Sequence, residues 1–174
     1  MLWVKTLGVV LVMAGFGSYG LLGANSLEKR VEQIRNVRLA MGFLEKEINY
    51  LHTPLPLAFS RSAQCVQEPA RSLFENCSQS LQDRQGITIS EVWGQSLVKI
   101  RGLSDLNNED FEILQLVSSQ IGMSGTEEQN RLFAMIQEQL IIQEGQARRE
   151  AEAGHKLRAY GGFIVGAAIV LLLI

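Results

Sequence analysis

Both ends of the chain carry long apolar runs that contain no charged residue. One run covers residues 6–24 and is nineteen residues long, and the other covers residues 159–174 and is sixteen residues long. An α-helix rises about 1.5 Å per residue, so these runs would extend about 28 Å and about 24 Å, against a hydrocarbon core of roughly 30 Å. The sequence therefore predicts terminal membrane helices at residues 1–24 and 159–174, with one domain, residues 25–158, between them.

Two other interpretations of these runs remain open, a cleaved signal peptide at the front and a buried core helix at the back. A signal peptide ends in a small-x-small cleavage site, and Leu22 stands where the first small residue is needed before Ala24. The second run is short for a span, and it crosses if Arg158 extends to the headgroups and Tyr160 lies at the interface. We expect two membrane helices.

The basic residues near the two runs predict the orientation of the chain. Lys and Arg close to a membrane helix stay on the cytoplasmic side. Such residues follow the first run and precede the second: Lys29, Arg30, Arg35, Arg38, Arg148, Arg149, Lys156 and Arg158. The central domain is therefore expected in the cytoplasm and both termini outside. Cys65 and Cys77 would then lie in a reducing compartment, where we expect them to be small buried hydrophobic residues.

Apolar residues recur at every third or fourth position after the first run. This spacing is typical of one face of an amphipathic helix, and Asn25 with Glu28 resembles a capping box at its start. The pattern predicts a stalk helix of about 26 residues, continuous with the first membrane run or joined to it by a kink near Gly23. Its apolar face, called the stalk stripe, comprises Leu27, Val31, Ile34, Val37, Met41, Leu44, Ile48 and Leu51.

The segment YLHTPLPLAF, residues 50–59, stands where the stalk stripe stops. Proline is tolerated in the first turn of a helix but not inside one, so we expect the stalk helix to end by His52, with Thr53 capping a second helix that Pro54 begins. A metal or catalytic site at His52 requires further ligands or a nucleophile, and the other histidine of the chain is the distant His155. We interpret His52, Thr53, Pro54 and Leu55 as a structural corner and a candidate partner contact.

Further helices are predicted after the corner. The second and third begin at Pro54 and Pro69, and a Thr88–Glu91 capping box begins the fourth, in which Trp93 is expected to anchor the core. Together with the four corner residues, Trp93 is also interpreted as a structural motif position and a candidate partner contact.

The fifth and sixth predicted helices complete the domain. The fifth runs from about Asn108 to Gly122, and a Thr126–Gln129 capping box begins the sixth, which continues unbroken to the second membrane run. No alternating segment is long enough to carry a sheet. The fold class is therefore all-α, a six-helix antiparallel bundle whose long first and last helices continue into the two terminal membrane helices. We expect the apolar faces of these two helices to pack together.

The sequence contains no recognisable catalytic or cofactor motif. A phosphate-binding loop, a dinucleotide fingerprint, zinc-ligand spacing and a catalytic triad are all lacking, so we expect no enzyme, cofactor, metal or small-molecule substrate. The central domain carries all eighteen acidic and fifteen of the sixteen basic residues, a balance that disfavours nucleic acid as a partner. In the first run, small residues four positions apart predict close packing of membrane helices: Ala14 with Ser18, and Gly20 with Ala24.

Several segments, taken in order, are similar to a known family. They are QIRNVRLAMGFLEKEINYLHTPLPLAF, ISEVWGQSL, IGMSGTEEQNRL and LRAYGGFIVGAAIVLLLI. With the two terminal runs they resemble the stage III sporulation protein AB family over nearly the whole chain. They resemble more distantly the cytoplasmic domains of inner-membrane platform proteins of type II secretion and type IV pilus machines.

The resemblance implies a component of the channel complex between mother cell and forespore, set in the mother-cell-derived membrane around the forespore. The partners that it implies are a cytoplasmic secretion-type ATPase and other membrane proteins of the complex, and the family has no established catalytic residues to carry over. An alternative is a membrane-anchored scaffold or signalling module that forms a homo-oligomer, a dimer, through the stalk stripe. A third is an exported, tethered domain with a Cys65–Cys77 disulfide, and an enzyme is the least favoured class.

Overall fold

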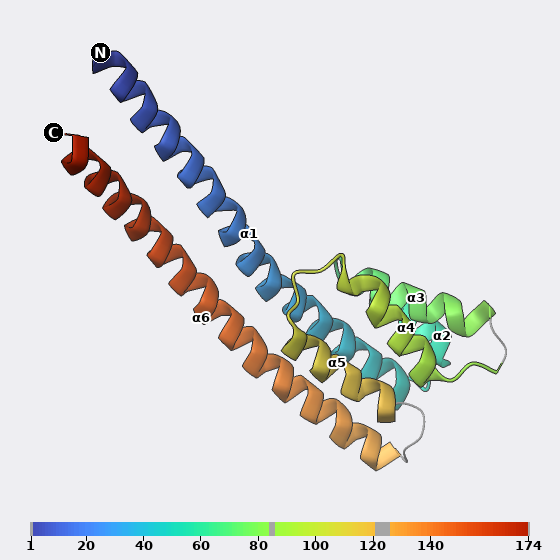
Figure 1. Ribbon diagram of the computed structural model, residues 1–174. Coiled ribbons are helices and arrows are strands. Elements are labelled where there is room, and N and C mark those ends of the chain that lie inside the picture. Colours follow the sequence, from blue (N-terminus) through green and yellow to red (C-terminus); the bar gives the residue numbers. More distant parts are fainter. Residues whose placement is uncertain (1, 84–85, 121–125, 174) are drawn as a thin grey trace. The chain divides into compact units, whose positions relative to one another are not determined.

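The computed structural model describes residues 2–83, 86–120 and 126–173, with side chains for residues 25–83, 86–118 and 127–154. The described chain is helical and contains no strand, which confirms the predicted all-α class (Figure 1). Its helices are α1 (Leu2–Asn49), α2 (Leu55–Gln64), α3 (Ala70–Asp83), α4 (Ile89–Arg101), α5 (Asn108–Gln120) and α6 (Thr126–Leu173).

The chain divides into two compact units, to each of which α1 and α6 both contribute. One unit comprises Met1–Lys29 and Ala147–Ile174, and the other comprises Arg30–Gln146. The second unit, called the helical domain, contains α2 to α5 and, among the residues whose side chains are described, nearly all of the buried core. Because α1 is a single helix from Leu2 to Asn49, Asn25 lies in its interior, and the predicted helix start at Asn25 is wrong.

The predicted membrane helices lie outside the part of the chain whose side chains are described. Within residues 25–83, 86–118 and 127–154, no helix is long and apolar enough to cross a membrane. Residues 1–24 and 159–174, including the small-residue pairs Ala14/Ser18 and Gly20/Ala24, stay predictions.

The stalk stripe forms one wall of the core of the helical domain. Ile34, Val37, Met41 and Leu44 are at most 1% exposed, whereas Leu51 is exposed because it follows the end of α1. The other stripe positions of α1, Leu27, Val31 and Ile48, are half-buried. The central positions thus pack inside the helical domain, and the alternative of a dimer through the stalk stripe stays a prediction.

Helices α1 and α6 pack side by side in the helical domain, as predicted (Figure 1). Gln137 Nε2 of α6 donates to the carbonyl oxygen of Arg38 at 3.0 Å, and Arg38 Nε lies 3.0 Å from Glu144 Oε2. A Cβ on Gly42 would lie 3.2 Å from Gln137 Nε2, so the missing side chain leaves room for this contact. Asn49 near the end of α1 donates to Asn130 near the start of α6. The two helices therefore run antiparallel in the helical domain.

Helices α2 to α5 pack on one another in chain order around three aromatic rings. Phe59, Phe74 and Trp93 come from α2, α3 and α4, and their ring centroids lie 5.6 to 6.1 Å apart. The indole N–H of Trp93 donates to the carbonyl oxygen of Leu114 at 2.7 Å, which links α4 to α5. Buried aromatic residues with a satisfied polar atom are strong core anchors. The prediction for Trp93 is confirmed.

Helix boundaries that depend on local side chains are mostly as predicted. Glu91 N donates to Thr88 Oγ1 at 3.3 Å, and Thr88 N donates to a carboxylate oxygen of Glu91 at 3.2 Å. Helix α3 follows Pro69 directly, and α5 begins at Asn108. Gly122 and the side chain of Thr126 lie outside the described residues.

The two cysteines differ from each other, and both are free. Cys77 on α3 is fully buried, and this burial raises the pKa of its thiol to about 12. Cys65 follows the end of α2 and is exposed. The prediction of a buried hydrophobic residue is therefore confirmed for Cys77 and wrong for Cys65, which stands at the C-cap of α2 with its Sγ donating to the carbonyl oxygen of Arg61 at 3.5 Å.

Candidate functional sites: an exposed corner and a buried polar network

The corner between α1 and α2 is a tight reversal made by backbone hydrogen bonds. Tyr50 N and Leu51 N both donate to the carbonyl oxygen of Lys46, and Thr53 N donates to that of Glu47 at 2.9 Å. His52 adopts φ 49°, a left-handed conformation that is common just after a helix but costly for a residue with a side chain. The stalk helix therefore ends at Asn49, before His52 as predicted.

Thr53 does not cap α2. The N-cap residue is Pro54, without a side-chain cap, and its carbonyl oxygen accepts from Ala58 N at 2.9 Å. If Thr53 were the N-cap, Pro56 would stand at the third helical position with no N–H to offer a capping hydroxyl. The Thr53 hydroxyl donates instead to Glu47 Oε2 at 2.7 Å. The predicted cap, with Pro54 as the first residue of α2, is wrong for these reasons.

Glu47 connects the corner to both neighbouring helices. Besides the Thr53 hydroxyl, Glu47 Oε2 accepts from Arg61 Nη1 of α2 at 3.0 Å. The Thr53 hydrogen bond and then the Arg61 contacts lower the pKa of Glu47, while partial burial opposes this. We call Glu47, Thr53 and Arg61 the Glu47 clasp, since its members tie α1, the corner and α2 together.

The clasp leaves large apolar side chains exposed. Tyr50 is 76% exposed and Leu51 is 62% exposed. His52 and Pro54 are also exposed, and Leu55 is half-buried. Trp93, in contrast, is 1% exposed and belongs to the core. Of the predicted motif positions, the corner residues are thus accessible to a partner, whereas Trp93 is buried in the core of the helical domain.

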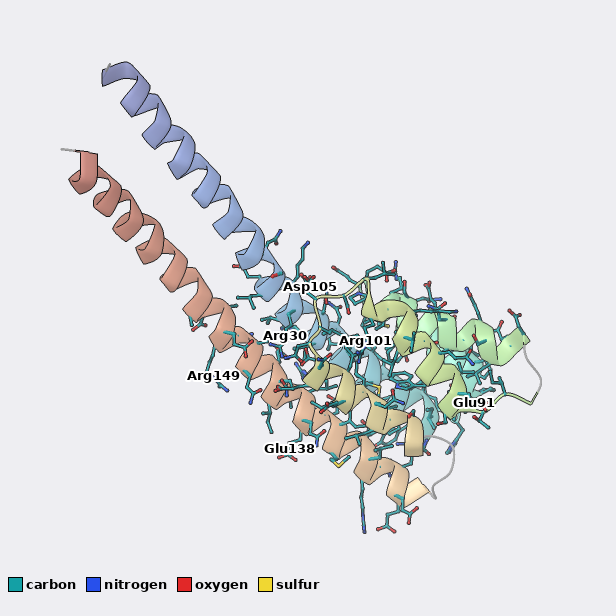
Figure 2. All side chains as sticks on the ribbon, viewed as in Figure 1. Arg30, Glu91, Arg101, Asp105, Glu138 and Arg149 are labelled. Carbon is teal, nitrogen blue, oxygen red and sulfur yellow. The ribbon has the colours of Figure 1, made fainter. Side chains whose placement is uncertain are left out.

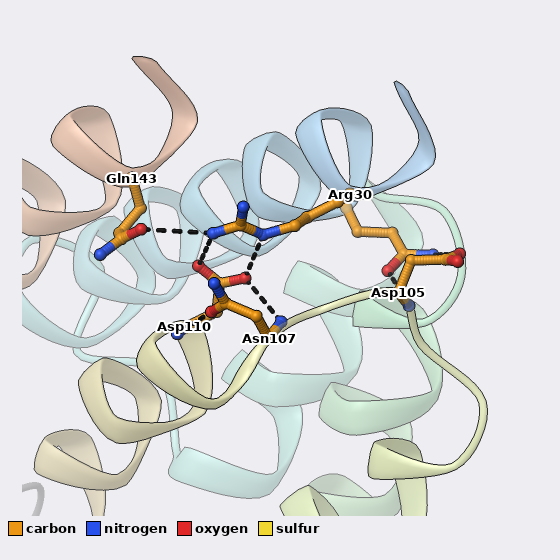
Figure 3. A network of polar contacts seen from close by, with 6 residues as sticks. Arg30, Asp105, Asn107, Asp110 and Gln143 are labelled. Carbon is orange, nitrogen blue, oxygen red and sulfur yellow. Dashed lines mark hydrogen bonds and ion pairs between the residues drawn. The ribbon is translucent and has the colours of Figure 1, made fainter. Parts of the chain in front are cut away.

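A second group of functional interest is a polar network that joins α1 to the start of α5 (Figure 3). Arg30 Nε donates to Asp110 Oδ2 at 2.8 Å, and Arg30 Nη2 donates to Oδ1 at 3.0 Å. The side chains are only 6% and 1% exposed. This paired contact matches the planar fork of a guanidinium to both oxygens of a carboxylate.

Asp110 also closes the N-terminus of α5. Asn107 N donates to Asp110 Oδ2 at 2.9 Å, and Asp110 N donates to Asn107 Oδ1 at 2.9 Å. This reciprocal pair satisfies two backbone donors at the helix start. Arg30 Nη2 lies 3.4 Å from Gln143 Oε1 of α6. The guanidinium of Arg30 therefore connects α1 to both α5 and α6.

Gln33, close to Arg30 on the same face of α1, holds the preceding loop. Asp105 N donates to Gln33 Oε1 at 2.8 Å, and Gln33 Nε2 donates to Asp105 Oδ2 at 3.2 Å. Nearby, the guanidinium of Arg101, a residue labelled in Figure 2, lies over the Phe111 ring, 4.7 Å from its centroid. The connection between α4 and α5 is therefore fixed by side chains from α1, α4 and α5.

Sequence reasoning missed this network. It interpreted Arg30 only as a basic residue beside the membrane and named no partner for it. Two signals were available: Asn107 and Asp110 have capping-pair spacing, and Arg30 stands four residues before Ile34, on the apolar face of α1. A charge on a core-facing stripe needs a buried partner.

The described residues contain no cluster that suggests metal chemistry. Within residues 25–83, 86–118 and 127–154, no group of three or more His, Cys, Asp or Glu side chains is placed to hold a metal ion. The side chain of His155 lies outside these ranges. What the described sites offer is an exposed apolar corner and a buried joint between helices.

Comparison with known proteins identifies the family. The family model for stage III sporulation protein AB matches residues 5–174. The chain belongs to the stage III sporulation protein AB family. Stage III sporulation protein AB of Bacillus subtilis (strain 168) is 29% identical over 169 residues, which cover 97% of this chain and 98% of the relative. The family predicted from the sequence segments is thus confirmed.

A solved structure supports the same family assignment. It is a structure of stage III sporulation protein AB (SpoIIIAB), with a TM-score of 0.67 and 28% sequence identity. The match covers 71% of this chain and 97% of the solved one. Sequence and fold therefore both lead to the same sporulation family.

Proposed function

We propose that this stage III sporulation protein AB family member is a non-enzymatic membrane platform of the channel complex between mother cell and forespore. Its helical domain faces the mother-cell cytoplasm and docks a secretion-type ATPase, and both termini lie outside. Membership of the family supports the sporulation role. The terminal apolar runs and the basic residues beside them support the membrane location.

The observation that carries the docking role is the exposed apolar corner. Tyr50 and Leu51 are adjacent in the chain and mostly exposed, and exposed apolar groups of this kind often mark protein contacts. The Glu47 clasp holds their backbone in one path before a partner arrives. A surface that is already ordered loses less conformational entropy on binding than a flexible loop.

Co-purification from sporulating cells tests this role. The full-length protein, extracted in mild detergent, is expected to retain the secretion-type ATPase. Replacing both corner residues, Tyr50→Ser with Leu51→Ser, should abolish retention and leave the melting temperature nearly unchanged, since both side chains are exposed.

A matched control is available elsewhere on the helical domain. Val98 and Leu103 are 74% and 78% exposed, so Val98→Ser with Leu103→Ser removes a comparable apolar surface at the end of α4. This control should retain the ATPase. Equal retention by the corner variant and the control would rule out the corner, and failure of the unchanged protein to retain the ATPase would rule out docking itself.

A further inference from the structure

The Arg30–Asp110 pair is unusual because it is almost completely withdrawn from water. Taking two charges out of water opposes folding, and apolar residues of similar volume often stabilise such a position equally well. An exposed pair elsewhere in the domain, Arg131 with Glu127, has side chains 79% and 85% exposed. Stability alone therefore does not explain a buried pair at this position, whereas a requirement for one defined geometry does.

The geometry of the pair is restrictive. Asp110 Oδ2 accepts from both Arg30 Nε and Asn107 N, while Oδ1 accepts from Arg30 Nη2. A slide of α1 by one residue moves Arg30 by about 1.5 Å. Hydrogen bonds of 2.8 to 3.0 Å do not survive such a shift without rearrangement. A slide of α1 would also disturb the capped start of α5.

A second contact point removes the remaining freedom. Gln33 lies three residues after Arg30 on α1 and binds the backbone N–H and the carboxylate of Asp105. Two fixed points on one helix face restrict rotation about the helix axis as well as sliding along it. Gln143 adds α6 to the same joint through Arg30 Nη2, as Figure 3 shows.

We propose that Arg30 and Gln33, with Asp105, Asn107, Asp110 and Gln143, form a register lock. The lock holds α1 in one axial and rotational setting against the start of α5 and against α6, so that α1, α5 and α6 move as one block within the helical domain. The lock depends on these contacts alone and stands whether or not the domain docks an ATPase.

Distance measurements between spin labels test the lock in the full-length protein in detergent. Labels are placed on exposed positions of α1 and α5 by Arg35→Cys with Glu112→Cys, and on α1 and α6 by Arg35→Cys with Glu138→Cys. Figure 2 marks Glu138 on α6. Cys65→Ser removes the exposed native thiol, and Cys77 stays because it is fully buried.

The decisive variant removes both charges, Arg30→Met with Asp110→Asn, so that an amide oxygen at position 110 still accepts from Asn107 N. Helix content and melting temperature should stay close to those of the parent, whereas the single narrow distance distribution should broaden at least twofold or split, because α1 gains alternative settings. An unchanged narrow distribution in a folded double variant overturns the proposal.

Two further variants keep the result interpretable. Arg131→Met with Glu127→Leu changes the exposed pair and should leave both distributions unchanged; if it broadens them equally, the broadening is not specific and the lock is rejected. Arg30→Lys keeps the positive charge but lacks the planar fork. It should broaden the distribution even where the double variant does not fold, and an unchanged width in Arg30→Lys also overturns the lock.

Discussion

Glu47 and His52 together set the path of the corner, Glu47 through its carboxylate and His52 through its backbone. The carboxylate accepts from two side chains that follow it in sequence, and His52 turns the chain at φ 49°. The imidazole itself has no part in the reversal. What His52 contributes at the residue scale is its left-handed backbone conformation.

Substitutions of His52 should follow backbone preference. His52→Gly is expected to be neutral or slightly stabilising, because glycine adopts positive φ without strain. His52→Val should destabilise the protein by about 1–2 kcal/mol, since a β-branched residue is strained in the left-handed region. Thermal unfolding of the three proteins measures this order. A His52→Gly variant that is less stable than His52→Val would show that the imidazole, and not the backbone, matters.

The corner should loosen in acid. The pKa of Glu47 is lowered below its ordinary value of 4.5 by the hydrogen bond from Thr53 and by Arg61. A carboxyl with a lower pKa in the folded state contributes stability that is present above about pH 4.5 and is lost as the pH falls through the folded-state pKa. Glu47→Gln should therefore lower the melting temperature at pH 7, and this difference should shrink below pH 4.5. A melting-temperature difference between Glu47→Gln and the unchanged protein that does not vary with pH would contradict the role of the Glu47 carboxylate in the clasp.

At the scale of helices, sequence patterns predict the features that depend on residues close together in the sequence. The stalk stripe and the Thr88–Glu91 cap follow from residues three or four positions apart, and both were predictable. The Thr53 cap failed because Pro56 removes a donor and Glu47 offers a charged acceptor. The Arg30–Asp110 pair joins residues 80 positions apart, so the sequence offered only the signal of a charge on an apolar face.

The stalk stripe predicts a sharp contrast between two leucines of α1. Leu44 is fully buried and Leu39 is 43% exposed. Leu44→Asp should destabilise the protein by at least about 3 kcal/mol, because it buries a charge without a partner. Leu39→Asp should change stability by less than about 1 kcal/mol. Chemical unfolding of both variants measures the difference, and similar losses would mean that the burial of α1 is wrongly described.

At the scale of the whole molecule, a packed helical domain lies in the sequence between two predicted membrane helices. The domain Arg30–Gln146 is compact by itself. The membrane location and the cytoplasmic orientation rest on the apolar runs and on the basic residues near them. These proposals are tested in cells, where the membrane is present.

Cysteine labelling tests the orientation. On a background with Cys65→Ser and Cys77→Ala, Val98→Cys provides one exposed thiol on α4. An impermeant maleimide should not react with it in intact cells and should react after the membrane is permeabilised. Reaction in intact cells would place the helical domain outside and would favour the exported alternative.

Photo-crosslinking in sporulating cells tests the central claim most directly. A photoreactive amino acid replaces Leu51 in one strain and Leu103 in another, since both side chains are largely exposed. We expect a crosslinked product that contains the secretion-type ATPase from position 51 and none from position 103. Absence of this product from position 51, in a strain that still sporulates, would contradict a platform that docks the ATPase through its corner.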